Sequence, residues 1–298
     1  MATALASTGK HVVTGISRHD SKSQIVDCAK VFKLDYDDEM SLIEALKGQQ
    51  FLIVTLFRGA PKDTQAKIIK AAAKAGVPWI MPNCYGSDIQ NRTLGEENFT
   101  GLPILESLNI IEQLGVSSWI AMCCSFWYEH SLSQGESWYG FDFKAKSVTF
   151  FDDGNTRINT TTWDQCCRAM TGLLSLKELP EDKNDTSVTL STWRNQPLYI
   201  SSFLLSQRNI LDSVHHVLGT TDASWTIKQE ASRARYERGL ELAKQTPIGL
   251  AVCLYARTFF PNGDGNYEAK YGLANKALGL PDESVDETTR RAIETVYR

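Results

Sequence analysis

The first 123 residues alternate short apolar segments with segments of helical pattern, and this alternation restricts the possible folds most strongly. Glycines at 48, 76 and 115 close three of the helical segments, as expected at helix C-termini. Short apolar strands that alternate with helices predict a parallel sheet covered on both faces. The expected strands are 11–16, 31–34, 51–55, 77–81 and 116–123. The expected helices are 38–47, 62–75, 104–114 and a stretch near 23–29.

The pattern changes near residue 140. An Asp-Gly dipeptide within 152–155 predicts a hairpin between 147–151 and 156–161. A strand at 198–202 and helices at 163–175, 207–218 and beyond 229 follow. We therefore expect an α/β protein: a Rossmann-like doubly wound parallel sheet in residues 1–140, with a smaller α+β substrate region in residues 141–298. The second region should lie over the carboxyl edge of the sheet, where ligands bind in such folds.

Composition excludes several classes of protein. A net charge of -4 gives no reason to expect nucleic acid or an anionic membrane as a partner. No apolar run is long enough to cross a membrane, and no secretory signal is visible. Seven cysteines occur without a C-x-x-C spacing, so we expect no metal site, and reduced thiols in a cytoplasmic protein. The expected partner is a small-molecule substrate, and the oligomeric state stays open.

Residues 1–18 have the pattern of the second half of a dinucleotide-binding βαβ unit. They contain the end of a helix, a turn at Gly9 and an apolar strand that leads to Arg18. The first half of such a unit holds the pyrophosphate on backbone amides at a helix N-terminus, through a glycine-rich turn. The sequence given does not contain that turn. We therefore expect a dinucleotide cofactor, with impaired binding in this chain.

The segment that ends at Arg18 should face the adenosine ribose, together with Ser21 and Lys22. An arginine at this position favours a 2′-phosphate, and therefore NADP(H) over NAD(H). A solvated surface cation is the alternative interpretation. Asp35 and Tyr36 follow the next strand, where contacts to adenine occur.

The remaining strand ends supply further candidates. The expected cofactor-binding residues there are Thr55, Leu56, Pro82 and Asn83. The aromatic segment after the strand at 116–123 can wall an apolar substrate pocket, with ordinary core packing as the alternative. The expected pocket residues are Cys84, Phe126 and Trp127.

Seven segments, in this order and spacing, resemble the NmrA-like and isoflavone-reductase-like group of atypical short-chain dehydrogenases, especially its fungal branch. They are residues 8–18, 34–38, 71–83, 115–129, 150–155, 199–202 and 259–264, so the resemblance covers nearly the whole chain. It implies a Rossmann domain, NADP(H) as cofactor, and reduction of a small aromatic or secondary-metabolite substrate.

The sequence departs from that group at its catalytic lysine. No lysine occurs between Lys74 and Lys144, and no tyrosine is followed by lysine four residues later. Hydride transfer to a carbonyl still needs a proton donor. We expect Tyr85 to serve, with Tyr128 second and His130 as a further possibility. Two other hypotheses stay open: a non-catalytic dinucleotide-binding regulatory protein, and an inactive truncated form.

Overall fold

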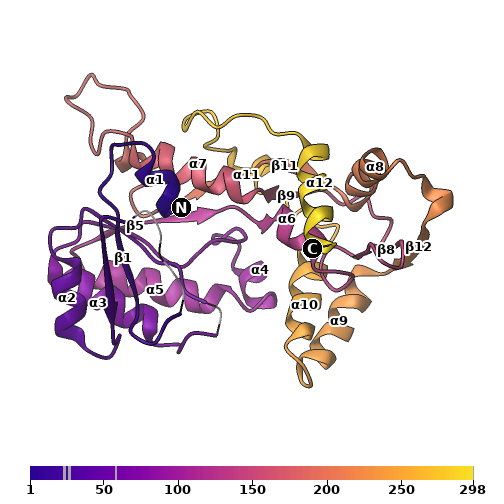
Figure 1. Cartoon of the computed structure of the whole chain (residues 1–298), viewed down its shortest axis with the longest axis horizontal. Helices are drawn as coiled ribbons and strands as arrows, with labels where there is room; N and C mark the ends of the chain where they lie inside the picture. Colours follow the sequence, from indigo (N-terminus) through magenta and orange to yellow (C-terminus); the bar gives the residue numbers. More distant parts are fainter. Residues whose placement is uncertain (23–24, 26–27, 58, 298) are drawn as a thin grey trace.

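The computed structural model describes residues 1–22, 25, 28–57 and 59–297. Its centre is a four-stranded parallel sheet of order β10-β5-β4-β3 (Figure 1). The strands are β3 (Phe51–Ile53), β4 (Trp79–Met81), β5 (Ser118–Cys123) and β10 (Gln196–Tyr199). Since neighbouring strands run parallel, their carboxyl ends share one edge.

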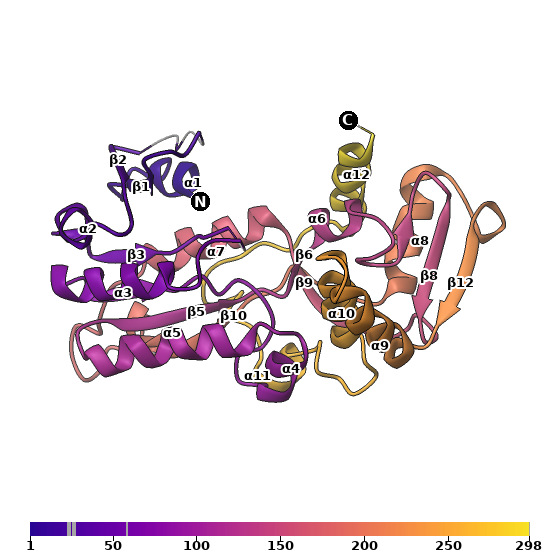
Figure 2. The same cartoon turned by 90° about the horizontal axis from the view of Figure 1, so that it is seen from below.

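A second parallel pair consists of β1 (Thr14–Arg18) and β2 (Lys30–Leu34). Figure 2 shows this pair set apart from the four-stranded sheet. Within the described ranges, β1 pairs only with β2 and β3 pairs only with β4. The predicted parallel architecture is therefore present as two separate sheets.

Helices cover both faces of the four-stranded sheet, which confirms the predicted α/β class. On one face lie α2 (Glu39–Leu46), α3 (Thr64–Ala75) and α5 (Gly101–Leu114), around a core that includes Ile69, Ile80 and Ile111. On the other lie α1 (Ala2–Ala6) and α7 (Trp163–Leu174), around Met81, Met122 and Met170 (Figure 1).

The helix ends follow from local sequence. The Asp38 side chain accepts a hydrogen bond from the Ser41 amide at 3.2 Å and so caps α2. Gly76 and Gly115 adopt left-handed φ angles of 77° and 66° at the ends of α3 and α5. These caps fix where each helix stops, and therefore where each following strand begins.

The second half contains two small three-stranded sheets and a set of helices. One sheet holds β6 (Phe126–Trp127), β9 (Ile158–Thr161) and β11 (Phe203–Leu205), and the other β7 (Phe141–Asp142), β8 (Ser147–Phe151) and β12 (Thr226–Glu230). The helices that surround their core are α6 (Tyr128–Ser133), α8 (Gln207–Leu218), α9 (Ser232–Ala243), α10 (Ile248–Thr258) and α12 (Val285–Val296). Shorter elements are α4 (Arg92–Glu97), α11 (Glu268–Tyr271), η1 (Leu190–Trp193) and η2 (Asp222–Ser224).

The hairpin predicted around residues 152–155 is wrong. β8 pairs with β7 and β12, whereas β9 pairs with β6 and β11. The Asp152 amide donates to the Glu230 carbonyl at 2.9 Å, so the turn is attached to β12. Gly154, at φ 74°, sits against the Phe150 ring, which a Cβ would approach to 2.6 Å. The Asp-Gly turn therefore links two sheets.

Two other expectations differ in detail. β1 begins at Thr14 rather than at residue 11. The strand expected at 198–202 is β10, which joins the sheet of the first half through β5. The boundary near residue 140 stays a prediction. The helical stretch expected near 23–29 lies largely outside the described residues. No helix in the described ranges is long and apolar enough to cross a membrane.

Candidate functional site

Arg18 lies at the carboxyl end of β1 with its side chain 62% exposed. Its Nε is 3.6 Å from the Asp20 carboxylate, a loose contact that leaves the guanidinium open to a ligand. Tyr36, just beyond β2, is half-buried. Burial raises the pKa of Tyr36, and the positive charge of Arg18 opposes that rise. The two predicted cofactor residues therefore lie within electrostatic range of one another.

The other predicted residues of this pair of strands are placed nearby. The Ser21 amide donates to the Arg18 carbonyl at 3.1 Å, so the chain turns back directly after β1. Lys22 is exposed. Asp35 is exposed too, and its carboxylate accepts from the Asp37 amide at 2.9 Å.

Asn83 joins the ends of β3 and β4. Its side-chain oxygen accepts from the Leu56 amide at 3.1 Å, and its amide nitrogen donates to the Leu56 carbonyl at 3.2 Å. Thr55 beside it is exposed, whereas Pro82 is buried. Because both the oxygen and the nitrogen of the Asn83 side chain form hydrogen bonds with the Leu56 backbone, Asn83 fixes the conformation of this loop.

Tyr85 is partly buried against the core on the α7 face of the sheet. Its hydroxyl donates to the Val54 carbonyl at 3.2 Å, and burial raises the pKa of that hydroxyl. The group predicted as the first proton donor thus lies at the strand ends, with its proton engaged by the backbone.

Of three further predicted residues, Cys84 and Tyr128 are buried and Phe126 is partly buried. Cys84 is 1% exposed, and burial raises the pKa of its thiol to about 12. Phe126 stacks on Tyr255 with ring centroids 3.9 Å apart. Tyr128 is fully buried, and its hydroxyl lies 2.7 Å from the Thr289 hydroxyl. Phe126 and Tyr128 pack in the core of the second half. Cys84 packs in the core between the four-stranded sheet and helices α2, α3 and α5.

Trp127 instead belongs to an accessible aromatic cluster with His130 and Trp163. The two indoles lie 6.5 Å apart, and the imidazole lies 6.5 Å from Trp127 and 6.3 Å from Trp163. Trp127 is 36% exposed and Trp163 49%. Burial lowers the pKa of His130, which favours its neutral form. This cluster offers flat apolar surface where β6 meets the start of α7.

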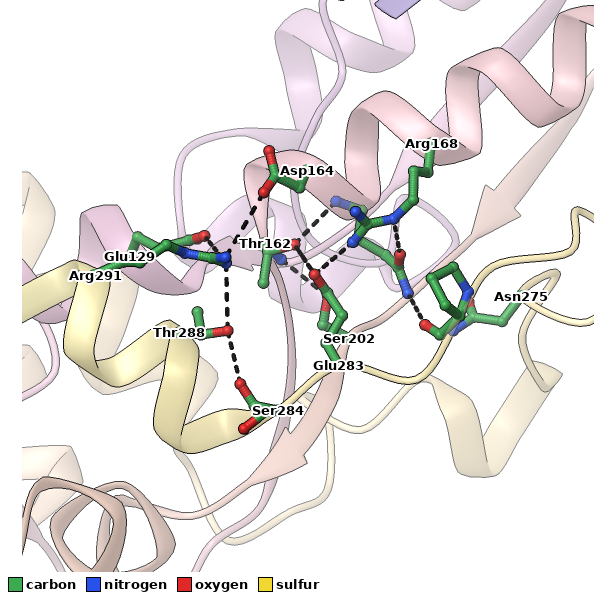
Figure 3. Close-up of polar contacts among 12 residues, drawn as sticks. Glu129, Thr162, Asp164, Arg168, Ser202, Asn275, Glu283, Ser284, Thr288 and Arg291 are labelled. Atoms are coloured by element: carbon green, nitrogen blue, oxygen red, sulfur yellow. Dashed lines mark hydrogen bonds and ion pairs between the residues drawn. The ribbon is translucent and has the colours of Figure 1, made fainter. Parts of the chain in front are cut away.

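Three carboxylates lie at the N-terminal end of α7, those of Glu129, Asp164 and Glu283 (Figure 3). Glu283 accepts from the hydroxyls of Thr162 and Ser202 and forms an ion pair with Arg168 at 2.5 Å. Because all of these partners donate to its carboxylate, Glu283 has a structural role: it holds Thr162, Ser202 and Arg168 together. Glu129 accepts from Arg291 at 3.1 Å through one oxygen only.

The strand ends fit part of NADP(H). The exposed guanidinium of Arg18 suits a 2′-phosphate, and Tyr36 suits the adenosine. Ser17 precedes Arg18, and its buried hydroxyl has no partner in the part of the chain that the structure describes. That orphaned hydroxyl fits a further ligand contact. No glycine-rich turn joins a strand to a helix N-terminus among the described residues, so we assign the pyrophosphate to none of them.

Sequence reasoning missed Ser17, Glu129 and Trp163. Trp163 reads as an ordinary first residue of a helix, and its place beside Trp127 depends on the fold. Glu129 directly follows the aromatic residues Phe126, Trp127 and Tyr128, and a charged residue next to an apolar segment was the signal that could have identified it. Groups of three or more possible metal-binding side chains do not occur within the described ranges.

Comparisons with known proteins agree with this geometry. Residues 1–88 match a family model described as NAD(P)H-binding. Oxidoreductase aprR of Aspergillus flavus is 28% identical over 293 residues, which cover 96% of this chain and 92% of that protein. The crystal structure of isoflavone reductase has a TM-score of 0.72 at 18% identity and covers 97% of this chain and 94% of its own. The NADPH complex of the quinone oxidoreductase QOR2 from Escherichia coli has a TM-score of 0.67 at 15% identity, covering 98% and 95%.

Fold and strand ends together define an α/β protein of the Rossmann-like class with an NAD(P)H-binding sequence pattern in its first 88 residues. More particularly, the chain has the fold of isoflavone reductase and related NmrA-like reductases, which confirms the resemblance seen in the sequence.

Proposed function

We propose that this chain is an NADP(H)-dependent oxidoreductase that reduces a small aromatic or secondary-metabolite carbonyl compound. The observation that carries the proposal is the accessible cluster of Trp127, His130 and Trp163 next to the end of β5. In a parallel sheet of this type, ligands bind outside the carboxyl ends of the strands. Stacking on two indoles favours a flat aromatic substrate.

The residues of the chain divide between binding and orientation. Arg18 would hold the 2′-phosphate, with Tyr36 beside the adenosine. Trp127 and Trp163 would hold the substrate and exclude water from its reactive group. When bound, NADP(H) supplies the hydride, so the chain itself must supply the proton. Tyr85 and Tyr128 were the expected proton donors, but the hydroxyl groups of both already form hydrogen bonds within the protein.

A regulatory dinucleotide-binding protein is the second candidate. It is favoured by the Tyr85 hydroxyl, which donates to a backbone carbonyl rather than pointing a free proton toward a ligand. Such a protein would bind NADP(H) without turnover.

A carbonyl screen separates the two functions. Aromatic aldehydes, ketones and enones are incubated with an excess of NADPH, and the absorbance of NADPH is followed. The proposal expects turnover that weakens when Trp127→Leu or Trp163→Leu removes a stacking surface, mainly through a higher KM. Trp193→Leu is the matched control, because η1 directly precedes β10, which runs parallel to β5, and so lies at the amino end of the sheet. Binding of NADPH without turnover of any compound would favour the regulatory protein.

A further inference from the structure

Glu129 is a buried carboxyl group with one free oxygen. It lies in the first turn of α6, directly after β6, and its side chain is 9% exposed. Oε1 accepts from Arg291 of α12 at 3.1 Å. Oε2 is buried and has no hydrogen-bond partner in the described ranges of the chain. A buried oxygen without a partner carries a free-energy cost, which a ligand contact would remove.

The groups that face Glu129 come from several elements. Desolvation is the largest influence and raises its pKa. The backbone amide of Glu129 itself, the positive charge of Arg291 and the backbone amide of Trp163 oppose that rise. Tyr128, Tyr139 and Cys166 also interact with it electrostatically. Burial raises the pKa of both tyrosines, and a hydrogen bond with Cys124, together with burial, raises the pKa of the Cys166 thiol, so all three are neutral at ordinary pH.

Glu129 also lies at the aromatic cluster. It is preceded by Trp127 and Tyr128 and followed by His130, and its carboxyl group is near enough to Trp163 to feel that residue's amide. A substrate stacked on the two indoles would therefore bring its polar group toward Oε2 of Glu129, a buried carboxyl oxygen that lacks a hydrogen-bond partner among the described residues. The Tyr85 hydroxyl, by contrast, already donates to the backbone.

We propose that Glu129, through its free Oε2, donates the proton to the substrate oxygen. This inference rests on the proposed reductase function. The carbonyl C=O π bond breaks as its carbon gains the cofactor's hydride, and its oxygen takes the proton from the Oε2–H bond. The two electrons arrive with the hydride, and the product is an alcohol. The carboxylate that remains is paired with Arg291 and regains its proton from water.

The test begins with a measurement that needs no cofactor. The infrared carboxyl band of the parent is compared with that of Glu129→Gln near pH 7. A protonated Glu129 gives a difference band of a neutral carboxylic acid, which the variant lacks. A carboxylate signal instead would overturn the proposal, whatever the turnover of the parent.

Turnover of an aromatic ketone is then measured across pH with an excess of NADPH. Glu129→Gln should lose about 10²–10⁴-fold in kcat, while binding of NADPH, followed by fluorescence, stays unchanged. The parent should lose activity as the pH rises through the pKa of Glu129, because the donor form is the protonated one. Arg291→Gln should move that loss to higher pH, since it removes a neighbouring positive charge.

Asp164→Asn is the matched control. Asp164 faces the same Arg291 at 3.8 Å but is 62% exposed, so its loss should leave kcat unchanged. Full turnover in Glu129→Gln, or a large loss in Tyr85→Phe alone, would overturn the donor assignment and leave the reductase function intact. A parent without turnover on any carbonyl compound would refute the reductase function and the donor assignment together.

Discussion

Replacement of Arg18 by alanine should weaken the binding of NADP(H) but not that of NAD(H). The guanidinium is 62% exposed, and its only carboxylate contact within the described ranges is Asp20 at 3.6 Å. A charge-assisted hydrogen bond contributes about 1.5–3 kcal/mol, and screening at an exposed site favours the lower part of that range. We therefore expect a loss of about 1.5–2 kcal/mol for NADP(H), which is about 10–30-fold in Kd.

Isothermal titration calorimetry with NADPH and NADH measures this difference directly. The affinity for NADH should change by less than about twofold, because NADH carries no 2′-phosphate for Arg18 to contact. The control is Lys47→Ala, an exposed cation paired with Glu44 at 2.6 Å at the far end of α2. Equal losses for the two cofactors in Arg18→Ala would refute the placement of the 2′-phosphate.

Three further predictions concern affinity and stability. Residues 1–298 should bind NADP(H) more weakly in calorimetry than the same chain with a strand and glycine-rich turn grafted before Met1; equal affinities would contradict the impaired binding. Glu97→Ala removes a carboxylate partner from the buried guanidinium of Arg257 and should lower the free energy of unfolding in urea by about 1–3 kcal/mol, whereas an unchanged midpoint would contradict it. Hydrogen bonds from Arg208 and His215 lower the pKa of Asp222 to about 2, so its stabilising effect should be present above about pH 4 and lost as the pH falls to about 2. Acid titration of Asp222→Asn should lack that part of the transition.

The first half of the fold follows from local sequence. Apolar segments separated by amphipathic ones specify strands and helices, and Gly76 and Gly115 mark the helix ends through their left-handed backbone. Parallel pairing then follows from the helical crossovers. Bounds shift by a few residues, as at Thr14, because pairing rather than propensity decides where a strand starts.

Pairing partners in the second half could not be predicted in the same way. The Asp-Gly dipeptide at 153–154 correctly indicates a turn, but no local signal says that Asp152 bonds to Glu230 of β12. A tight turn between two extended segments leaves the choice of neighbours to tertiary packing. The hairpin prediction failed for that reason.

The sequence could predict that the candidate site lies at the carboxyl edge of the sheet, but not which side chains are accessible there. Residues at strand ends, such as Arg18 and Tyr36, follow from topology alone. The accessibility of a side chain does not, since Tyr128 and Cys84 are buried by elements distant in the sequence. Glu129 depends on Arg291, which lies 162 positions away, so no local pattern could reveal its environment.

Transfer of deuterium from NADPH labelled at C4 of the nicotinamide ring tests the proposed reductase function most directly. An aromatic ketone is incubated with the labelled cofactor and the protein, and the product is analysed by mass spectrometry. We expect the alcohol with a single deuterium on the former carbonyl carbon, formed by the parent and reduced about 10²–10⁴-fold in Glu129→Gln. Binding of NADPH with no labelled alcohol from any ketone would contradict a reductase and leave a dinucleotide-binding regulatory protein in its place.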